Sequence, residues 1–474
     1  MVSRRWYHRM YTMEVSKALK IIQSDGPSRG LHLNVTKTKI FWPSFDPRRE
    51  AAGVFPPNIG KPSAGVKLLG GPVSLGLQYC SVMVHSRVGK TLQLMDKMKQ
   101  LQDLQSELLL LRNCSGVSRL YFTLRITTPS AIQTAAAHFD KHLLQYLRQI
   151  VVGDEAGFGL IQHLVTLPLK VGGLGIHTMS NTGQFCFLAS CAQTQHLQTT
   201  ILKQLSVPVS SLMYQQAVQT YNQVCGLSDT NFSINDAAPR YMKSLAVIYF
   251  GVVKEKIATD FSLSDRDLTL WHYNIISHPM DFLKAIPISG LNQAIVLKQF
   301  RSVLSYRFGI PLFGKDNTCS SCNRHMEVFR DHALHCASDI RPKLRHNLVR
   351  NVLADMCYKA GVAARKEAVL GFLSDNATSL RPADILVYTW EDGKDVCMDI
   401  IGVSPFTSAS TRDLSSGHAI SAAIACKRTK YLDKCLSHGY SFGVLAFSIM
   451  GALGEQTLFS AEIKKLSSQS GCKS

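Results

Sequence analysis

The sequence lacks any long hydrophobic run. A membrane-spanning helix needs about 20 consecutive apolar residues. The best apolar stretch, residues 442–453, is short, contains Gly443, Ser448 and Gly451, and is typical of a strand and loop. The basic N-terminus (Met-Val-Ser-Arg-Arg-Trp) is followed by no apolar stretch, so we expect no secretory signal. We therefore expect no membrane partner, and we predict an intracellular, nuclear location.

Acidic residues are also scarce. The chain has 33 Asp+Glu against 52 Lys+Arg, a net charge of +19 in 474 residues. Its 46% hydrophobic and 18% charged residues exclude the disordered class, and its length suits roughly three domains of about 100–200 residues each. Such an excess of positive charge favours a polyanionic partner. We predict that the chain binds DNA and RNA, and the sequence leaves its oligomeric state open.

Two common nucleotide-binding motifs are incomplete. Gly89-Lys90-Thr91 resembles the end of a phosphate-binding loop, but Val84 stands where that loop requires glycine. The glycine-rich residues 172–175 do not fit a dinucleotide fingerprint. Neither segment therefore indicates a phosphate-binding loop or a dinucleotide-binding site.

Hydrophobic periodicity predicts a mixed α and β chain. The expected elements are a helix at 13–24, a strand at 37–41, a loop at 43–65, a strand at 66–73 with a Gly-Gly-Pro break, an amphipathic helix from 88 to about 114, mixed helices to about 310 with breaks at 167–175 and 228–239, strands and a helix at 367–450, and a frayed tail from 467. Residues 298–366 carry 13 basic and 5 acidic side chains. This segment is expected to follow a nucleic-acid backbone.

One group of cysteines has the spacing of a metal site. The chain has 13 cysteines, an odd number typical of buried thiols in a reducing compartment. A Cys-x2-Cys turn, nine residues, a His, three residues and a Cys can supply a tetrahedral zinc site, and these residues are Cys319, Cys322, His332 and Cys336. His335 and His325 are competing ligands; His335 adjoins Cys336, which would strain the chelate. The alternative is three unrelated thiols in a basic loop.

Two aspartates flank a predicted hairpin. Asp392-Gly393 lies between two apolar runs, which is a strong hairpin signal. If it forms a two-residue turn, Asp399 faces Leu386 and shares a sheet face with Asp384 as a diagonal neighbour, about 7–8 Å away. Carboxylates so arranged can hold one divalent cation, Mg²⁺ or Mn²⁺. A three-residue turn would move Asp399 to the other face, and the alternative role is two strand-end carboxylates paired with Arg or Lys.

Other residues could complete a catalytic site around the aspartates. Glu367 could supply a third oxygen ligand. Lys427, Lys430 and Tyr431 have helical spacing, and Lys427 lies four residues from Tyr431 on one face. A lysine near a metal-bound phosphate could orient the attacking water or neutralise developing charge. The alternative is an exposed basic helix end.

These elements together resemble the C-terminal part of a plant-type non-long-terminal-repeat retrotransposon reverse transcriptase/endonuclease protein. In that family a CCHC zinc knuckle precedes an α/β restriction-endonuclease-like domain related to the PD-(D/E)xK nucleases. The resemblance matches the four cysteine and histidine ligands to the knuckle and assigns the nuclease roles to Asp384, Asp399, a displaced lysine at Lys427 or Lys430, and Tyr431. Ala383 interrupts the Pro-Asp pair, and no lysine follows Asp399 as in a standard motif, so activity depends on the displaced lysine.

The same resemblance implies four consecutive domains: an α+β reverse transcriptase palm remnant at 1–80, a mostly α-helical thumb and linker at 81–297, the basic segment with its knuckle at 298–340, and the nuclease-like domain at 341–474. Residues 30–41 look like a late palm strand, with Lys37 as the family's conserved lysine, residues 68–73 look like the following hairpin, and residues 172–175 resemble a glycine cluster of the linker. The predicted nucleic-acid contacts are Lys37, Arg301, Arg307 and Arg345. The palm aspartates should precede residue 30, yet the chain has no Asp-Asp pair, so polymerase activity is not expected.

Three interpretations of function remain at this point. The chain is a metal-dependent DNA nickase fragment, a non-catalytic RNA- or DNA-binding remnant, or a relic without selected function. Positive charge and structural zinc support the first two equally. The carboxylate and lysine residues favour the first, whereas loss of the polymerase core favours the others.

Overall fold

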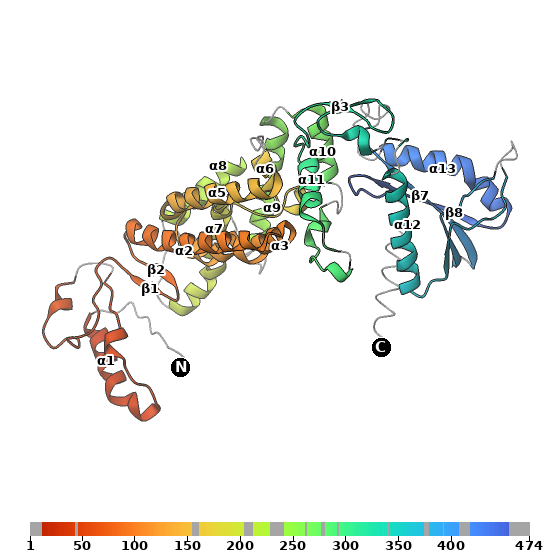
Figure 1. The fold of residues 1–474 in the computed structure, drawn as a ribbon. Coiled ribbons are helices and arrows are strands. Elements are labelled where there is room, and N and C mark those ends of the chain that lie inside the picture. The colour runs from red at the N-terminus through yellow and green to blue at the C-terminus, as the bar shows by residue number, and fades with distance from the viewer. Residues whose placement is uncertain are drawn as a thin grey trace. The chain divides into compact units, whose positions relative to one another are not determined.

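The structure is a computed structural model. It describes residues 12–42, 46–153, 161–202, 212–227, 241–260, 263–275, 280–291, 293–334, 336, 338, 341–373, 379–391, 393–406 and 418–454. The fold is mixed α and β, with helices throughout and small sheets (Figure 1). No helix in these ranges combines the length and the hydropathy needed to cross a bilayer. The predicted tail from 467 lies outside the described residues.

The chain forms two compact units. The first comprises residues 1–100, 111–143 and 177–251, and the second comprises residues 101–110, 144–176 and 252–474. The units therefore interleave along the chain, and residues 81–297 contribute to both. The four-domain division stays a prediction.

The first unit is mainly helical. Its elements, some shared with the second unit, are α1 (Thr12–Asp25), β1 (Val66–Leu68), β2 (Gly71–Val73), α2 (Leu77–Met98), a π-helical turn (Leu111–Ser115), a 3-10 turn (Val117–Leu120), α4 (Tyr121–Ile126), α5 (Pro129–Val151), α7 (Met179–Leu202), α8 (Leu212–Cys225) and α9 (Tyr241–Asp260). The helix predicted at 13–24 is confirmed as α1. The predicted break at 228–239 lies outside the described residues.

Three predictions in the first 120 residues differ from the structure in detail. The amphipathic helix expected from 88 to 114 begins earlier, in α2, and is interrupted after Met98, because Gln102 adopts a φ of 53° that no helix can contain. The strand expected at 37–41 is absent, since Val35–Lys37 form a 3-10 turn held by the Asn34 side chain. Residues 66–73 form a hairpin of two short antiparallel strands rather than one strand.

The second unit contains the cysteine segment and the larger sheet. Its elements are α3 (Leu104–Leu110), α6 (Ile161–Val165), α10 (Asp265–Ile275), α11 (Leu297–Arg307), β3 (Asn317–Thr318), β4 (His325–Met326), a 3-10 turn (Asp331–Leu334), α12 (Arg341–Lys359), β5 (Ala364–Lys366), β6 (Ile385–Glu391), β7 (Lys394–Val403), α13 (His418–Ser437) and β8 (Ser441–Ser448). The strands and helix expected between 367 and 450 are confirmed.

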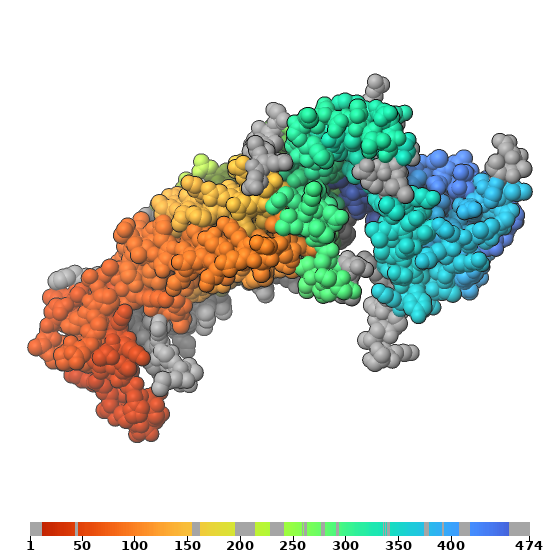
Figure 2. Space-filling view, in the orientation of Figure 1, coloured from red at the N-terminus to blue at the C-terminus, as the bar shows by residue number. Residues whose placement is uncertain are grey.

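The larger sheet has the strand order β5-β6-β7-β8, in which β7 and β8 are parallel and the other pairs antiparallel. One face packs against α12 through a core that includes Ile385, Val387 and Met398. The opposite face packs against α13 through Leu386 and Cys397. Figure 2 shows in space-filling form the cyan-to-blue part of the chain, which contains α12 and these strands.

The β6–β7 hairpin departs from the predicted register. Glu391 pairs with Lys394, as a two-residue turn requires, but Leu386 pairs with Cys397 and not with Asp399. An irregularity between Val387 and Glu391 shifts the register by two residues, and Thr389 there has a φ of 50°. A shift of two leaves every side chain on its original face.

The shifted register changes the pairing that was predicted for the two aspartates. Ile385 pairs with Met398, so the next position outward sets Asp384 across from Asp399. Because side chains alternate along a strand, both aspartates share the face of Leu386 and Cys397, which is covered by α13. The sheet therefore directs two carboxylates toward the helix that carries Lys427.

Candidate functional site

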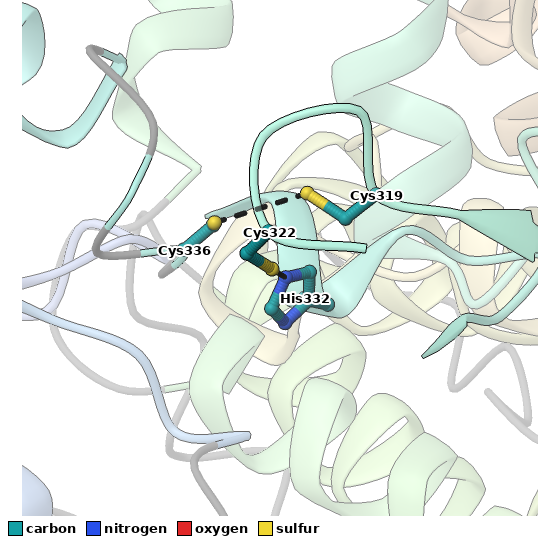
Figure 3. A group of neighbouring side chains, drawn as sticks. All are labelled: Cys319, Cys322, His332 and Cys336. Carbon is teal, nitrogen blue, oxygen red and sulfur yellow. Dashed lines mark hydrogen bonds between the residues drawn. The ribbon is translucent and has the colours of Figure 1, made fainter. Parts of the chain in front are cut away.

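Four side chains of the cysteine segment converge on one point. The metal-ligating atoms of Cys319, Cys322, His332 and Cys336 all lie within 4.8 Å of one another. Figure 3 shows the four side chains turned toward a common centre. Cys319 and Cys322 lie on the turn between β3 and β4, His332 lies on the following 3-10 turn, and Cys336 comes just after it. Within the described ranges this is the one such group of three or more His, Cys, Asp or Glu residues.

The distances suit a tetrahedral metal ion. Two thiolates on one zinc, each about 2.3 Å from the ion, lie about 3.8 Å apart. The Sγ atoms of Cys319 and Cys336 are 3.8 Å apart, and Cys322 Sγ lies 3.1 Å from His332 Nε2. The cluster could therefore hold a metal such as zinc.

Local hydrogen bonds favour the thiolate form of one ligand. The backbone N–H of Ser321, with smaller contributions from Cys322 and Cys336, lowers the pKa of Cys319 to about 6. Burial raises the pKa of Cys336. Of the competing ligands, His325 is exposed and directs Nε2 to Asp316 Oδ2 at 3.1 Å, and His335 lies outside the described residues.

An arginine anchors the cysteine segment to α10. Arg266 donates from Nε and Nη2 to the two carboxylate oxygens of Asp331, both at 2.8 Å. Its guanidinium carbon lies 3.8 Å from the ring centre of Phe329. Since Asp331 immediately precedes His332, this bidentate pair fixes the turn that carries one of the four candidate ligands.

A second group of chemically active side chains lies at the edge of the larger sheet. Asp399 on β7 is buried, and its Oδ2 lies 2.8 Å from Lys427 Nζ on α13. Among the described residues that ammonium is the one polar partner of the oxygen. Burial raises the pKa of Asp399. Burial alone would lower the pKa of Lys427, but its hydrogen bond and charge attraction to Asp399 outweigh this and raise it.

The neighbouring aspartate has a histidine partner that the sequence did not indicate. Asp384 Oδ2 accepts a hydrogen bond of 2.7 Å from the Ile400 N–H and lies 3.1 Å from His346 Nε2 on α12. Burial opposes ionisation of Asp384, but these two hydrogen bonds leave its pKa lowered. The same contact raises the pKa of His346. His346 and Asp384 are 38 residues apart, so no spacing motif could have revealed the pair.

These groups line a cleft of about 420 Å³. Its walls include both aspartates, His346 and Tyr431, together with four basic side chains: Lys343, Arg345, Arg381 and Lys427. The basic residues outnumber the acids by two, before any contribution from His346. The cleft therefore offers carboxylate ligands at its base within a cationic wall, which suits a bound cation beside an anionic substrate.

Two predicted catalytic residues lie elsewhere. Glu367 has a φ of 49°, and its carboxylate pairs with Arg350 instead of entering the cleft. Lys430 is exposed, and its ammonium lies 4.9 Å from the ring centre of Tyr431, outside the cleft lining. Lys427 and Lys430 are three residues apart on α13. The packing of α13 against the sheet places Lys427 in the cleft and leaves Lys430 outside its lining.

The predicted nucleic-acid contact at Arg307 is wrong. Arg307 is buried, and its guanidinium donates to Asn274 Oδ1 at 3.2 Å and to the Met450 carbonyl at 2.9 Å. Burial lowers its pKa to about 10. Arg307 therefore joins α10, α11 and the loop after β8, and cannot reach a polyanion.

The other three predicted contacts have different environments. Arg301 is half-buried, and its Nη2 donates to the Gln149 carbonyl at 3.0 Å, near the C-terminus of α5. Arg345 lines the cleft while Nη2 donates to the Leu334 carbonyl at 2.6 Å. Lys37 is exposed at the end of its 3-10 turn. Nucleic-acid binding at these positions stays a prediction.

Replacing Arg307 with alanine should lower the free energy of unfolding by about 3 kcal/mol, because Asn274 and the Met450 carbonyl would lose their buried donor. Urea unfolding followed by circular dichroism measures the change. Lys298→Ala, on an exposed position of the same helix, should leave the unfolding midpoint unchanged. Equal midpoints for the two variants would contradict the structural role of Arg307.

Comparison with known protein families and with curated proteins gives no match to this chain.

Proposed function

We propose that this chain is a nucleic-acid-binding fragment of a non-long-terminal-repeat retrotransposon protein, with a Mg²⁺- or Mn²⁺-dependent DNA nickase in its C-terminal part. The observation that carries the proposal is the 2.8 Å contact between Lys427 and the buried Asp399, beside Asp384 in a basic cleft. Two acids and a lysine converging on one face are what hydrolysis of a phosphodiester needs. The enzyme would act in the nucleus on DNA.

The two aspartates fit a hard divalent cation. Mg²⁺ is bound through oxygen, often by one or two carboxylates with the remaining positions left to water and substrate phosphate. Asp384 and Asp399 supply such carboxylates, and Oδ2 of Asp399 is buried with no polar partner but Lys427 among the described residues. When bound, the ion would act as a Lewis acid toward the phosphate and lower the pKa of a water ligand.

The protein side chains supply binding and charge neutralisation. Lys343, Arg345 and Arg381 in the cleft wall would hold the phosphates of the DNA backbone. Lys427 would orient the attacking water or offset the negative charge that develops on the phosphate. Tyr431 is buried one helical turn along α13, and its ring centre lies 5.5 Å from the Lys427 ammonium, within the range of a cation–π contact.

The cysteine cluster would have a structural role. Zinc is the proposed ion, because three thiolates and one imidazole make a closed tetrahedral site with no position for substrate. The sequence contains no adjacent Asp-Asp pair of the kind that a polymerase palm carries, so we do not expect DNA synthesis from this chain.

One observation favours a second candidate function. Each aspartate already has a side-chain partner, the Lys427 ammonium for Asp399 and the His346 imidazole for Asp384, and such pairs can be satisfied without a metal ion. A non-catalytic RNA- or DNA-binding remnant would keep these pairs as structural contacts. It would bind DNA with a steep salt dependence and leave supercoiled plasmid intact.

Lysine variants distinguish these functions in a nicking assay on supercoiled plasmid with Mg²⁺ or Mn²⁺. Lys427→Met should reduce the nicking rate by about 100-fold or more, because the variant loses the charge next to the reacting phosphate. Lys430→Met, three residues along the same helix, is the matched control and should nick as the parent does. Equal loss in both variants would contradict the assignment of Lys427. A parent that binds DNA with a steep salt dependence but shows no metal-dependent nicking would favour the binding remnant.

A further inference from the structure

A second basic cleft lies in the first unit, built from elements that the proposed nuclease does not use. It has a volume of about 470 Å³. Its charged lining residues are all cationic and come from three elements: Lys67 on β1, Arg87 and Lys90 on α2, and Arg119 on the 3-10 turn before α4. No acidic side chain is among the lining residues.

The sequence segments that contain the lining residues are depleted of acids. Residues 51–95 and 108–139 contain no Asp or Glu. At the chain-wide content of 33 acids in 474 residues, about five would fall within these 77 positions. The one acid on the elements that line the cleft is Asp96 on α2, and it pairs with Lys99 at 2.9 Å. These segments therefore supply no acid that could offset the charges of Lys90 and Arg119, which favours an external polyanion.

The walls of the cleft are held in place by one of its cations. Arg87 donates to Thr123 Oγ1 at 2.8 Å and to the Gly70 carbonyl at 2.6 Å, so it joins α2 to α4 and to the β1–β2 hairpin. Gly70 has a φ of 91°, and a Cβ there would lie 2.7 Å from the Arg87 guanidinium. The hairpin thus depends on glycine at this position. The Arg87 contacts hold the walls of the cleft together without a bound ligand.

The exposed cations of the cleft come from separate elements of the fold. Lys90 on α2 and Arg119 on the 3-10 turn are both exposed, and the exposed apolar side chain of Val82 is also among the lining residues. Charges distributed over several elements follow the repeated phosphates of a chain, and an apolar position beside them can contact a sugar or base. A site for one small anion would instead converge its donors on a point.

We infer that this cleft binds the phosphodiester backbone of a nucleic acid, as a binding site separate from the proposed nuclease. The contacts are to phosphates, so they should hold DNA or RNA without regard to base sequence. Binding here requires no divalent metal and does not depend on the proposed nicking activity.

The test measures binding to fluorescent DNA and RNA oligonucleotides of one sequence, at several salt concentrations and without added divalent metal. In Lys90→Gln/Arg119→Gln, the slope of log affinity against log salt should be smaller by about 1.4–1.8 than in the parent, since each phosphate contact contributes about 0.7–0.9. The matched control Lys97→Gln/Lys141→Gln removes two exposed charges of the same unit outside the cleft, and its slope should stay close to that of the parent.

Comparison of the DNA and RNA oligonucleotides identifies which polymer the cleft binds. The reduced slope in Lys90→Gln/Arg119→Gln can appear with DNA, with RNA or with both. Unchanged slopes in the cleft variant, or an equal loss in the control, would overturn the inference. So would full competition by millimolar pyrophosphate, which would indicate a small-anion site. Loss of binding to phosphatidylserine vesicles with oligonucleotide binding intact would reassign the cleft to a membrane surface.

Discussion

Asp399→Asn is expected to reduce metal-dependent nicking about a thousandfold or more. The substitution keeps the shape of a buried side chain but removes its negative charge. A neutral amide is a poor ligand for Mg²⁺, and the change also leaves the Lys427 ammonium, 2.8 Å away, without its counter-charge. Loss of a direct ligand should exceed the 10–100-fold effects of residues that act through the ligands. The rate of conversion of supercoiled to nicked plasmid measures the effect.

The same strand offers a matched control. Asp395 lies four residues before Asp399, and its Oδ1 accepts a hydrogen bond from the Thr389 N–H at 3.0 Å. The amide oxygen of an asparagine at this position can accept the same hydrogen bond, so Asp395→Asn should nick at the parent rate.

A double variant separates catalysis from folding. Asp399→Asn/Lys427→Met removes both members of the ion pair, so no unpaired charge remains buried, and it should fold and be inactive. Nicking that persists in either Asp399 variant would show that the catalytic assignment is wrong. DNA binding by the inactive variants should remain, because Lys343, Arg345 and Arg381 of the cleft wall are unchanged.

Removal of the proposed zinc should unfold the cysteine segment. Structural zinc sites in small peptides contribute roughly 10–16 kcal/mol of apparent binding energy, and this segment has only two short strands and one 3-10 turn to replace it. We expect about one zinc per chain by elemental analysis. Cys319→Ser should lose that zinc, and residues near 311–336 should become sensitive to protease.

Two variants serve as controls for the zinc prediction. His325→Ala removes a competing histidine that pairs with Asp316, and it should keep the metal, whereas His332→Ala should lose it. Cys114→Ser changes an exposed cysteine outside the cluster and should also keep the metal. A zinc-free parent, or a Cys319→Ser chain with full protease resistance, would contradict the structural role.

The two candidate sites differ in how far local sequence could predict them. The four ligands of the cysteine cluster lie within 18 residues of one another, and two tight turns are enough to bring them together. The spacing therefore predicted the cluster that the structure contains. The turn of the β6–β7 hairpin was also predicted, because Asp-Gly favours that conformation.

The cleft that contains Asp384 and Asp399 depended on contacts between distant elements. The register shift near Thr389 moved Leu386 from Asp399 to Cys397, and no local signal marks that irregularity. The choice between Lys427 and Lys430 depended on which face of α13 the sheet covers, and His346 reached Asp384 from a helix 38 residues earlier. These features depend on packing between distant elements, which the spacing of residues along the chain does not predict.

The sequence by itself determined the charge of this protein, its mixed α and β character, the four metal-ligand candidates and the hairpin turn. Each depends on composition or on neighbours along the chain, where backbone geometry leaves few choices. Only the tertiary structure decided that Arg307 is buried, that Lys427 faces Asp399, and that Lys67, Arg87, Lys90 and Arg119 share one cleft. Burial and charge pairing between distant segments are properties of the packed chain, because they exist only after helices and strands have met.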